Sequence, residues 1–189
     1  MKVVTLHPDT FGEVCQRLAD KVAEWHPDIL VGIVTGGEIV ARNMAKSISQ
    51  TTLHTVKLQR STTARKSSVR KLLKLLPTSL ADRLRIMEAR KAERRPHKVH
   101  EPLISSQLEH ALKENPKGKV LIVDDAVDSG DTLLSVVKAI QRIVPDAEVK
   151  SAVLTVTTSK PAISPDYSIW NDKTLLRFPW SLDYRTDRP

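Results

Sequence analysis

Two adjacent carboxylates, Asp124 and Asp125, are the residues of this chain best placed to do chemistry. They close a run of four apolar residues, 120–123, which is too short for a helix and is typical of a buried parallel strand. A loop of small residues, 126–130, follows, and an amphipathic helix is expected from about Asp131. Backbone N–H groups at a helix start can bind phosphate, and paired carboxylates suit Mg²⁺. The stretch VLIVDDAVDSGDT therefore predicts a site for a magnesium-bound sugar phosphate.

Two other interpretations of this stretch were weighed against the rest of the chain. The first is an ordinary strand, turn and helix with an acidic loop and no ligand. The second is the acidic strand of a nucleoside triphosphatase, which requires a loop of the pattern G-x-x-x-x-G-K-[ST]. Neither Gly-Lys-Ser nor Gly-Lys-Thr occurs in the chain, so the triphosphatase interpretation is set aside.

A second candidate anion site follows the apolar run ILVGIV at residues 29–34. Thr35, Gly36, Gly37 and Glu38 are expected to form a tight loop there. Two adjacent glycines let backbone N–H groups approach an anion closely, because no side chain stands in the way. The alternative is an ordinary glycine turn.

The elements that position these residues alternate along the chain between helices and strands. Apolar residues at helical spacing predict helices over 10–25, 39–49 and 103–114, and from 131 to Pro145. Short apolar runs predict strands over 29–34, 53–58, 120–123 and 149–156. This alternation predicts an α/β fold with a mostly parallel sheet flanked by helices.

Residues 59–102 are an unusual basic segment between two expected strands. From residue 57 to residue 100 there are 14 Lys and Arg and three acids, which leaves 16 basic and 19 acidic residues elsewhere. The net charge of +8 therefore comes from this segment, whose natural partners are polyanions. Its helical spacing predicts a hairpin with two apolar stripes that need burial against the body or another subunit: Val69, Leu72, Leu73 and Leu76, then Leu80, Leu84 and Met87.

Three roles are open for this basic hairpin: a structural element, a lid over the site, or a nucleic-acid surface. The last is disfavoured because the segment has no Phe, Tyr or Trp on which bases could stack. His97 and His100 are interpreted as surface residues rather than metal ligands, since no cysteine lies near them.

The stretch 120–132 resembles the phosphoribosyl-pyrophosphate (PRPP) motif of type I phosphoribosyltransferases, in which an apolar run, two acids and two variable residues precede D-[ST]-G-x-T. The resemblance implies one phosphoribosyltransferase domain over 1–189, with a hood at 158–189 and a mobile loop where 59–102 stands. The layout of the tail is similar to that of the small xanthine-guanine enzymes, on three pairs: Lys160-Pro161, Asp166-Tyr167 and Pro179-Trp180.

The resemblance implies a role for each motif residue. Asp124 and Asp125 bind the ribose hydroxyls, directly or through Mg²⁺, and Asp128 is the general base for the proton of the acceptor base. The 5′-phosphate is held by Asp128, Ser129, Gly130, Asp131 and Thr132. The side chain of Asp131 is expected to turn away, because a carboxylate repels a phosphate. Pyrophosphate is bound by Thr35, Gly36 and Gly37, with Thr35 where purine enzymes often carry Arg or Lys.

The tail would recognise the acceptor base. By resemblance, Lys160 hydrogen-bonds the 6-oxygen of a purine, and an ammonium group suits a carbonyl because it only donates. Leu175 and Leu176 fall near the position that stacks on the base, where leucine offers apolar contact without aromatic stacking. Trp180 is expected to pack.

The predicted function is Mg-dependent transfer of ribose 5-phosphate from PRPP to a nucleobase, a 6-oxopurine first, with release of pyrophosphate. Two alternatives stay open: a non-catalytic PRPP or nucleotide sensor that binds nucleic acid through the basic hairpin, and a transferase for a non-purine acceptor. The full carboxylate set of Asp124, Asp125 and Asp128 favours catalysis over sensing.

The setting of the protein is predicted from a few further features. Cys15 is the only cysteine, so no disulfide framework is expected and a reducing, cytoplasmic location is favoured. The start MKVVTLHPDT lacks the apolar core of a signal peptide, and no apolar run approaches the ~20 residues that span a bilayer. A homo-oligomer, dimer or tetramer, is expected, with no membrane partner.

Overall fold

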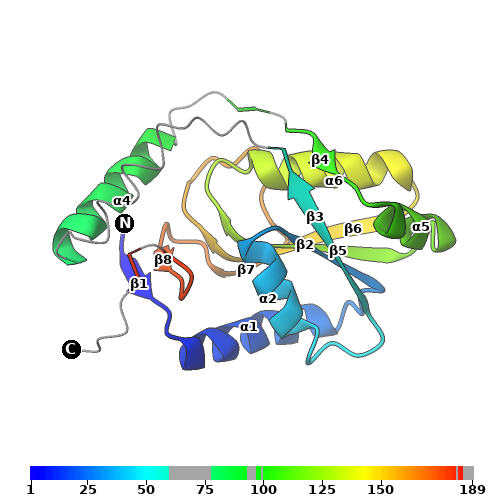
Figure 1. The fold of residues 1–189 in the computed structure, drawn as a ribbon, viewed down its shortest axis with the longest axis horizontal. Coiled ribbons are helices and arrows are strands. Elements are labelled where there is room, and N and C mark those ends of the chain that lie inside the picture. The colour runs from blue at the N-terminus through cyan, green and yellow to red at the C-terminus, as the bar shows by residue number, and fades with distance from the viewer. Residues whose placement is uncertain (60–77, 93–96, 99, 182, 185–189) are drawn as a thin grey trace.

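A six-stranded sheet in the order β4-β3-β2-β5-β6-β7 forms the centre of the protein (Figure 1). The computed structural model describes residues 1–59, 78–92, 97–98, 100–181 and 183–184. All strand pairs of this sheet are parallel except the antiparallel pair β3–β4. The strands are β2 (Ile29–Ile33), β3 (Thr52–Leu58), β4 (Pro102–Leu103), β5 (Lys119–Val127), β6 (Glu148–Val156) and β7 (Tyr167–Trp170). The predicted α/β fold with a mostly parallel sheet is thus confirmed.

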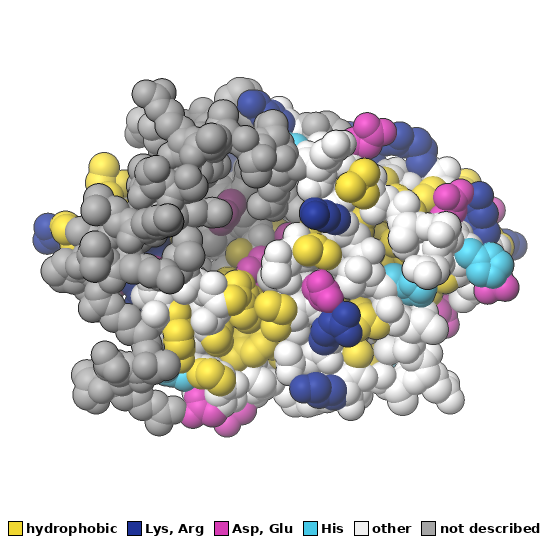
Figure 2. All heavy atoms as spheres, viewed as in Figure 1, with side chains coloured by type: hydrophobic (Ala, Val, Ile, Leu, Met, Phe, Trp, Pro, Cys, Tyr) yellow, Lys and Arg dark blue, Asp and Glu magenta, His cyan; other side chains and the backbone are white. Residues whose placement is uncertain are grey.

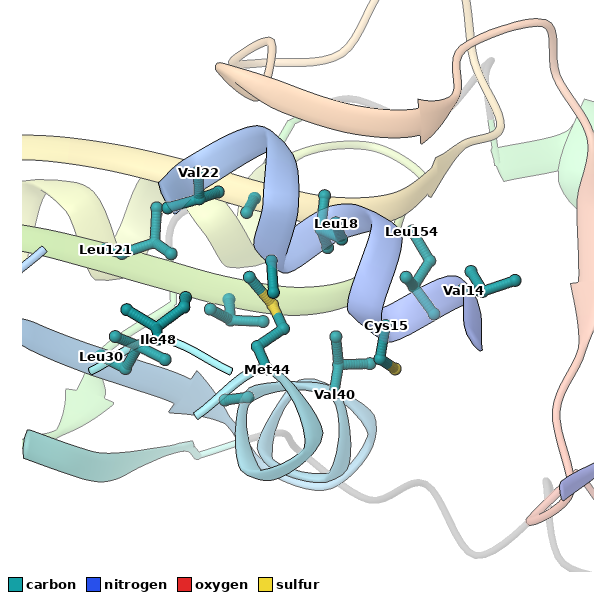
Figure 3. Close-up of a cluster of buried hydrophobic side chains, with 14 of the residues drawn as sticks. Val14, Cys15, Leu18, Val22, Leu30, Val40, Met44, Ile48, Leu121 and Leu154 are labelled. Atoms are coloured by element: carbon teal, nitrogen blue, oxygen red, sulfur yellow. The ribbon is translucent and has the colours of Figure 1, made fainter. Parts of the chain in front are cut away.

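Helices cover both faces of the sheet, because successive side chains of a strand point to opposite faces. On one face, α1 (Pro8–Ala23) and α2 (Gly36–Met44) pack with a cluster that includes Leu121 and Val123 of β5. Figure 3 shows Cys15 and Leu18 of α1 in this cluster together with Val40 and Met44 of α2. On the other face, α5 (Ser106–Glu114) and α6 (Asp131–Ile143) pack with residues that include Val120 and Ile122.

The chain reverses its direction of travel across the sheet between β2 and β5. From β2 it proceeds to β3 on one side, and after β4 it returns to place β5 on the other side of β2. In open α/β sheets, ligands bind beyond the carboxyl ends of the strands at such a switch point. Gly36 and Gly37 follow β2, and Asp124 and Asp125 lie near the end of β5, so both predicted motifs meet at this point.

Several element boundaries differ from those expected. β5 extends through both aspartates to Val127, which shortens the expected loop 126–130 to three residues. The helix expected over 103–114 starts only at Ser106, with the Ser105 hydroxyl capping the Leu108 N–H at 3.2 Å, and the preceding residues form β4. Strand pairing with β3 overrides local helical spacing there.

A separate two-stranded parallel sheet pairs β1 (Val3–Thr5) with β8 (Leu175–Arg177). β1 was not predicted from the sequence. The segment expected as a hood divides in two, because β7 extends the main sheet beside β6 while β8 leaves it for β1. Trp180 stacks on Phe178 at 4.7 Å, which agrees with its predicted packing role.

Helix α4 (Thr78–Ala92) lies in the expected basic hairpin and stands beside the β1–β8 sheet (Figure 1). The prediction that the second apolar stripe is buried is wrong within one copy of the chain, since Leu80 is 43% and Met87 65% exposed. Ala81 is buried instead, and charged residues of the same helix bond to the β8 region. The first expected stripe, residues 69–76, lies outside the described residues.

A network of ion pairs joins α4 to β8 and the segment after it. The Nε of Arg85 donates to Asp183 at 2.8 Å, and the Nε of Arg177 donates to the same carboxylate at 3.1 Å. Arg177, 5% exposed, also pairs with Asp82 and donates to the Thr5 hydroxyl at 2.9 Å. Although burial alone would raise the pKa of Asp183, its bonds to the two arginines lower it to about 2. No helix within the described ranges has the length and apolar character to cross a membrane.

Candidate active site

The two predicted anion-binding motifs lie directly against one another. A Cβ placed on Gly36 would stand 2.0 Å from Oδ2 of Asp125. A Cβ on Gly37 would stand 2.7 Å from the Asp124 Cα and 2.4 Å from the carbonyl oxygen of Val123. Both positions therefore require glycine, because any side chain there would clash with β5.

The first turn of α2 begins at Gly36, so the expected tight loop of residues 35–38 is wrong in form. Thr35, which is exposed, is the residue before the helix and follows a cis peptide bond after Val34. The first N–H groups of a helix have no partner within it and carry its positive dipole end. The glycine pair therefore presents a helix start, rather than a turn, to an anion beside the carboxylates.

The carboxylates of β5 are electrostatically crowded. Burial raises the pKa of Asp125, a side-chain hydrogen bond with its neighbour Asp124 lowers it, and the nearby charge of Asp128 raises it further. The net effect is a pKa above the ordinary value. The Asp125 N–H also donates to Oδ1 of Asp124 at 2.9 Å, which orients that carboxylate. A site with negative charge held close in this way favours a cation or a cationic transition state.

The predicted phosphate loop is the short turn of residues 128–130 between β5 and α6. Gly130 has φ of +80°, a left-handed conformation, and a Cβ on it would stand 2.8 Å from the Ala162 N. The Ala162 N–H donates to the carbonyl of Ser129 at 2.8 Å. The chain after β6 therefore supports this loop from behind, and glycine is required at position 130 for two independent reasons.

Asp128 has a partner that the sequence did not reveal. Its Oδ1 accepts a hydrogen bond of 2.7 Å from the hydroxyl of Thr157, which is 4% exposed and directly follows β6. The Thr157 N–H donates to the carbonyl of Val127 at 2.9 Å and fixes the two chain segments together. Asp128 itself is exposed. The feature of the sequence that could have revealed this contact is the threonine pair, Thr157 and Thr158, directly after β6.

Asp131 is the first residue of α6, and its carboxylate points to the end of the basic segment. This agrees with the expectation that its side chain turns away from a phosphate. Its Oδ1 is 2.7 Å from Nδ1 of His97, and its Oδ2 accepts from the Lys98 N–H at 3.0 Å. Burial would raise the pKa of Asp131, but these bonds and one with Ser129 lower it below the ordinary value. Its own N–H is 3.3 Å from the Ser129 hydroxyl. Nothing in the sequence linked residues 97–98 to this helix.

The predicted base-binding residues are placed less uniformly. Lys160 is exposed on the segment after β6 whose Ala162 supports the phosphate loop, and its N–H donates to the Thr158 hydroxyl at 3.3 Å. Leu175 and Leu176 are only 7% and 4% exposed in β8, and Leu176 belongs to the core cluster around α1. The contact of these two leucines with a base stays a prediction.

The donor set fits magnesium held together with a substrate. Within the described part of the chain, no three His, Cys, Asp or Glu side chains are grouped to hold a metal ion. Mg²⁺ characteristically takes one or two carboxylates and completes its shell with water and substrate phosphates. Asp124 and Asp125 supply hard oxygen ligands side by side near the end of β5.

Comparison with known proteins identifies both a family and a fold. The family described as the phosphoribosyl transferase domain matches residues 9–183. The purine phosphoribosyltransferase from Pyrococcus horikoshii Ot3 superposes with a TM-score of 0.62 and 20% identity, over 100% of this chain and 99% of its own. No curated protein sequence gives a significant match.

Two further solved structures share the fold. The Helicobacter pylori xanthine-guanine-hypoxanthine phosphoribosyltransferase superposes with a TM-score of 0.60 and 19% identity, covering 96% of this chain and 95% of its own. A hypothetical protein from Neisseria gonorrhoeae with bound ppGpp gives 0.62 and 19%, covering 95% and 89%. At these identities the likeness establishes the fold.

Proposed function

The chain belongs to the phosphoribosyl transferase domain family, and we propose that it moves the ribose 5-phosphate of PRPP to a 6-oxopurine base with release of pyrophosphate. The observation that carries this proposal is the contact of Gly36 and Gly37 with the carboxylates of Asp124 and Asp125. It places a helix start suited to pyrophosphate beside acids suited to the ribose of the same donor molecule.

The reaction breaks the bond between carbon 1 of the ribose and a pyrophosphate oxygen, and a base nitrogen forms a new bond to that carbon. Positive charge develops on the ribose ring in between, so fixed negative charge nearby lowers the barrier. Asp124 and Asp125 provide that charge and hold the ribose hydroxyls. Asp124 and Asp125 are the residues that would hold Mg²⁺, and the ion would stabilise the negative charge that develops on the leaving pyrophosphate.

Asp128 is proposed to take the proton that the base nitrogen loses. Its carboxylate is held on one side by the Thr157 hydroxyl at 2.7 Å, which leaves one oxygen to accept from the base. Such a fixed orientation is what general base catalysis requires, because the proton must pass along a hydrogen bond of near 3 Å. Ser129, Gly130 and Thr132 hold the 5′-phosphate at the start of α6.

The preference for a 6-oxopurine is supported by Lys160. Its segment adjoins the phosphate loop through the Ala162–Ser129 bond, so an acceptor base beside Asp128 lies within reach of this chain segment. An ammonium group donates to a 6-oxygen and cannot accept from a 6-amino group. The Helicobacter pylori structure is a xanthine-guanine-hypoxanthine enzyme, which agrees with this choice of acceptor.

Pyrophosphate release tests the proposal directly. The protein is incubated with PRPP and Mg²⁺ and, in separate reactions, guanine, xanthine, hypoxanthine, adenine, orotate or uracil. We expect release with a 6-oxopurine, and Lys160→Met should reduce the selectivity for it over adenine. Asp128→Asn should lower kcat by about 100-fold or more while PRPP binding persists. Release with orotate or uracil alone would transfer the proposal to a non-purine acceptor.

A second candidate is a nucleotide sensor without catalysis, favoured by one observation. The Neisseria gonorrhoeae protein holds ppGpp on the same fold, so this architecture accommodates a guanine nucleotide as a bound ligand. Retained guanine nucleotide binding with no pyrophosphate release from any base would select this alternative. Figure 2 shows basic and acidic side chains interspersed over one face of the described surface. A nucleic-acid role through residues 59–102 has less support, because this segment has no Phe, Tyr or Trp on which bases could stack.

Two properties of the working protein are proposed alongside the reaction. We expect a homo-oligomer, dimer or tetramer, because Leu80, Met87 and Leu103 are large apolar side chains exposed on one copy. Light scattering would check the mass. We also expect a cytoplasmic reaction, consistent with Cys15 being buried and unpaired.

A further inference from the structure

The contact between His97 and Asp131 joins the end of the basic segment to the start of α6. Asp131 is the first residue of α6, whose N-terminus forms the proposed 5′-phosphate site. His97 comes from the far end of the basic segment, 34 positions earlier, and its ring is half-exposed. The two side chains meet at 2.7 Å, between Nδ1 and Oδ1.

Both oxygens of the Asp131 carboxylate are in contact with this segment. Its side chain is 11% exposed, and its second oxygen accepts the Lys98 N–H at 3.0 Å. The segment is fastened a second time one turn along the helix, where the His100 N–H donates to Ser135 Oγ at 2.9 Å. Ser135 Oγ in turn donates to the Asp131 carbonyl at 2.7 Å. His97, Lys98 and His100 therefore hold the start of α6 at two points.

Without these partners, the carboxylate would interfere with phosphate binding. An acid in the first turn of a helix is attracted to the free N–H groups there, because they are donors and carry the positive end of the dipole. Those are the groups that a 5′-phosphate must use. A released Asp131 would compete with the phosphate for them and would also repel its charge.

We propose that His97 is a positioning residue for PRPP, which keeps the Asp131 carboxylate out of the 5′-phosphate site. This inference rests on the proposed function of the loop. His97 does not touch the substrate in this role; it acts through Asp131. Because a carboxylate only accepts hydrogen bonds, Nδ1 of His97 must carry a hydrogen in the contact. The end of the basic segment thereby becomes part of the donor-binding apparatus.

Four variants test the proposal: His97→Ala, Asp131→Asn, the double variant, and His110→Ala as the control. His110 makes a comparable contact, 3.3 Å to Glu114, but on the exposed surface of α5. We measure kcat and KM for PRPP, and the binding of ribose 5-phosphate by calorimetry. His97→Ala should raise KM and Kd about tenfold with kcat within about twofold, and His110→Ala should change neither.

The double variant separates an electrostatic role from a merely structural one. If His97 restrains a charge, removing that charge in His97→Ala/Asp131→Asn should restore ribose 5-phosphate binding to within about threefold of the original chain. A double variant as weak as His97→Ala, or a His97→Ala that binds normally, would overturn the proposal. Circular dichroism checks that each variant is folded. Absent pyrophosphate release with normal PRPP binding counts against the proposed reaction alone, whereas unaltered binding in His97→Ala counts against His97 alone.

Discussion

The α-carbon of Gly36 lies so close to Asp125 that a methyl group on it would stand 2.0 Å from Oδ2. Gly36→Ala must therefore displace the carboxylate, since the helix backbone on the other side is fixed by packing on β2. We expect kcat/KM for PRPP to fall at least about tenfold, with a stability loss of about 1–3 kcal/mol. The measurements are steady-state kinetics and denaturant unfolding.

Gly12→Ala is the matched control for that change. Gly12 also lies in a helix, α1, but nothing stands within 4 Å of its added Cβ. Alanine should stabilise there by about 0.5–1 kcal/mol, because glycine weakens a helix interior. Equal losses of activity in both alanine variants would show that the contact with Asp125 is not what matters.

Thr157→Val should affect the turnover rather than donor binding. The variant keeps the shape of the buried side chain and removes the hydroxyl that holds Asp128 at 2.7 Å. Loss of that orientation should lower kcat by about tenfold with KM for PRPP nearly unchanged. Thr155→Val is the control, since that buried hydroxyl donates at 2.6 Å to the Thr174 carbonyl and touches no acid. A kcat that falls equally in both would argue against orientation of Asp128.

Asp125→Asn should stabilise the fold while it weakens donor binding. The pKa of Asp125 is raised, first by burial, so the folded chain holds a proton there more readily than the unfolded chain. The free energy of unfolding therefore falls as pH rises from the ordinary value of 3.8 through the raised one. Asparagine cannot ionise and so removes this loss of stability, and Tm at neutral pH should therefore rise.

A pH series of thermal melts checks the sign of that effect. The Tm difference between Asp125→Asn and the original chain should shrink as pH falls toward 3.8 and below, where the carboxyl is protonated in both states. Asp146→Asn, an exposed acid in a turn, should show no such difference. A lower Tm for Asp125→Asn at neutral pH would contradict the predicted electrostatic strain.

Arg177→Gln should strongly destabilise the protein. Arg177 is 5% exposed and pairs with the partly buried Asp82 and with the buried side chain of Asp183. Its removal leaves Asp82 without this partner and Asp183 with Arg85 as its remaining arginine. Breaking a buried pair from one side typically costs about 3–5 kcal/mol. Arg42→Gln, whose partner Glu38 lies one turn away on the surface, should cost at most about 0.5 kcal/mol. Urea unfolding of the two variants measures the contrast.

The parallel sheet and the candidate site at the carboxyl ends of its strands could be proposed from the sequence, because each rests on local patterns. Apolar runs such as 120–123 and 149–156 identify buried strands, and glycines or acids directly after them identify the ligand edge. The family resemblance added the donor substrate through the residues around Asp128. These features depend on neighbours in the chain.

Contacts between distant segments were not predictable in the same way. β4 and β1 are too short to leave a pattern, and each exists because a partner strand lies beside it. The partners of Asp128 and Asp131 come from 29 and 34 positions away. The stripe of Leu80 and Met87 misled because α4 is held through Asp82 and Arg85 instead. Ion pairs such as these leave no periodic pattern in the sequence.

The basic segment is attached to the rest of the chain at two described places, α4 and residues 97–98. α4 supplies Asp82 and Arg85 to Arg177 and Asp183, and residues 97–98 supply one hydrogen bond to each oxygen of the Asp131 carboxylate. A shorter chain lacking residues 59–102 would thus not be a simpler working enzyme. In that shorter chain, the buried Arg177 would lose its acidic partner Asp82. The Asp131 carboxylate would lose its hydrogen bonds to residues 97–98 beside the proposed phosphate site. Engineering or evolution could remove the segment only by replacing Arg177 and Asp131 at the same time.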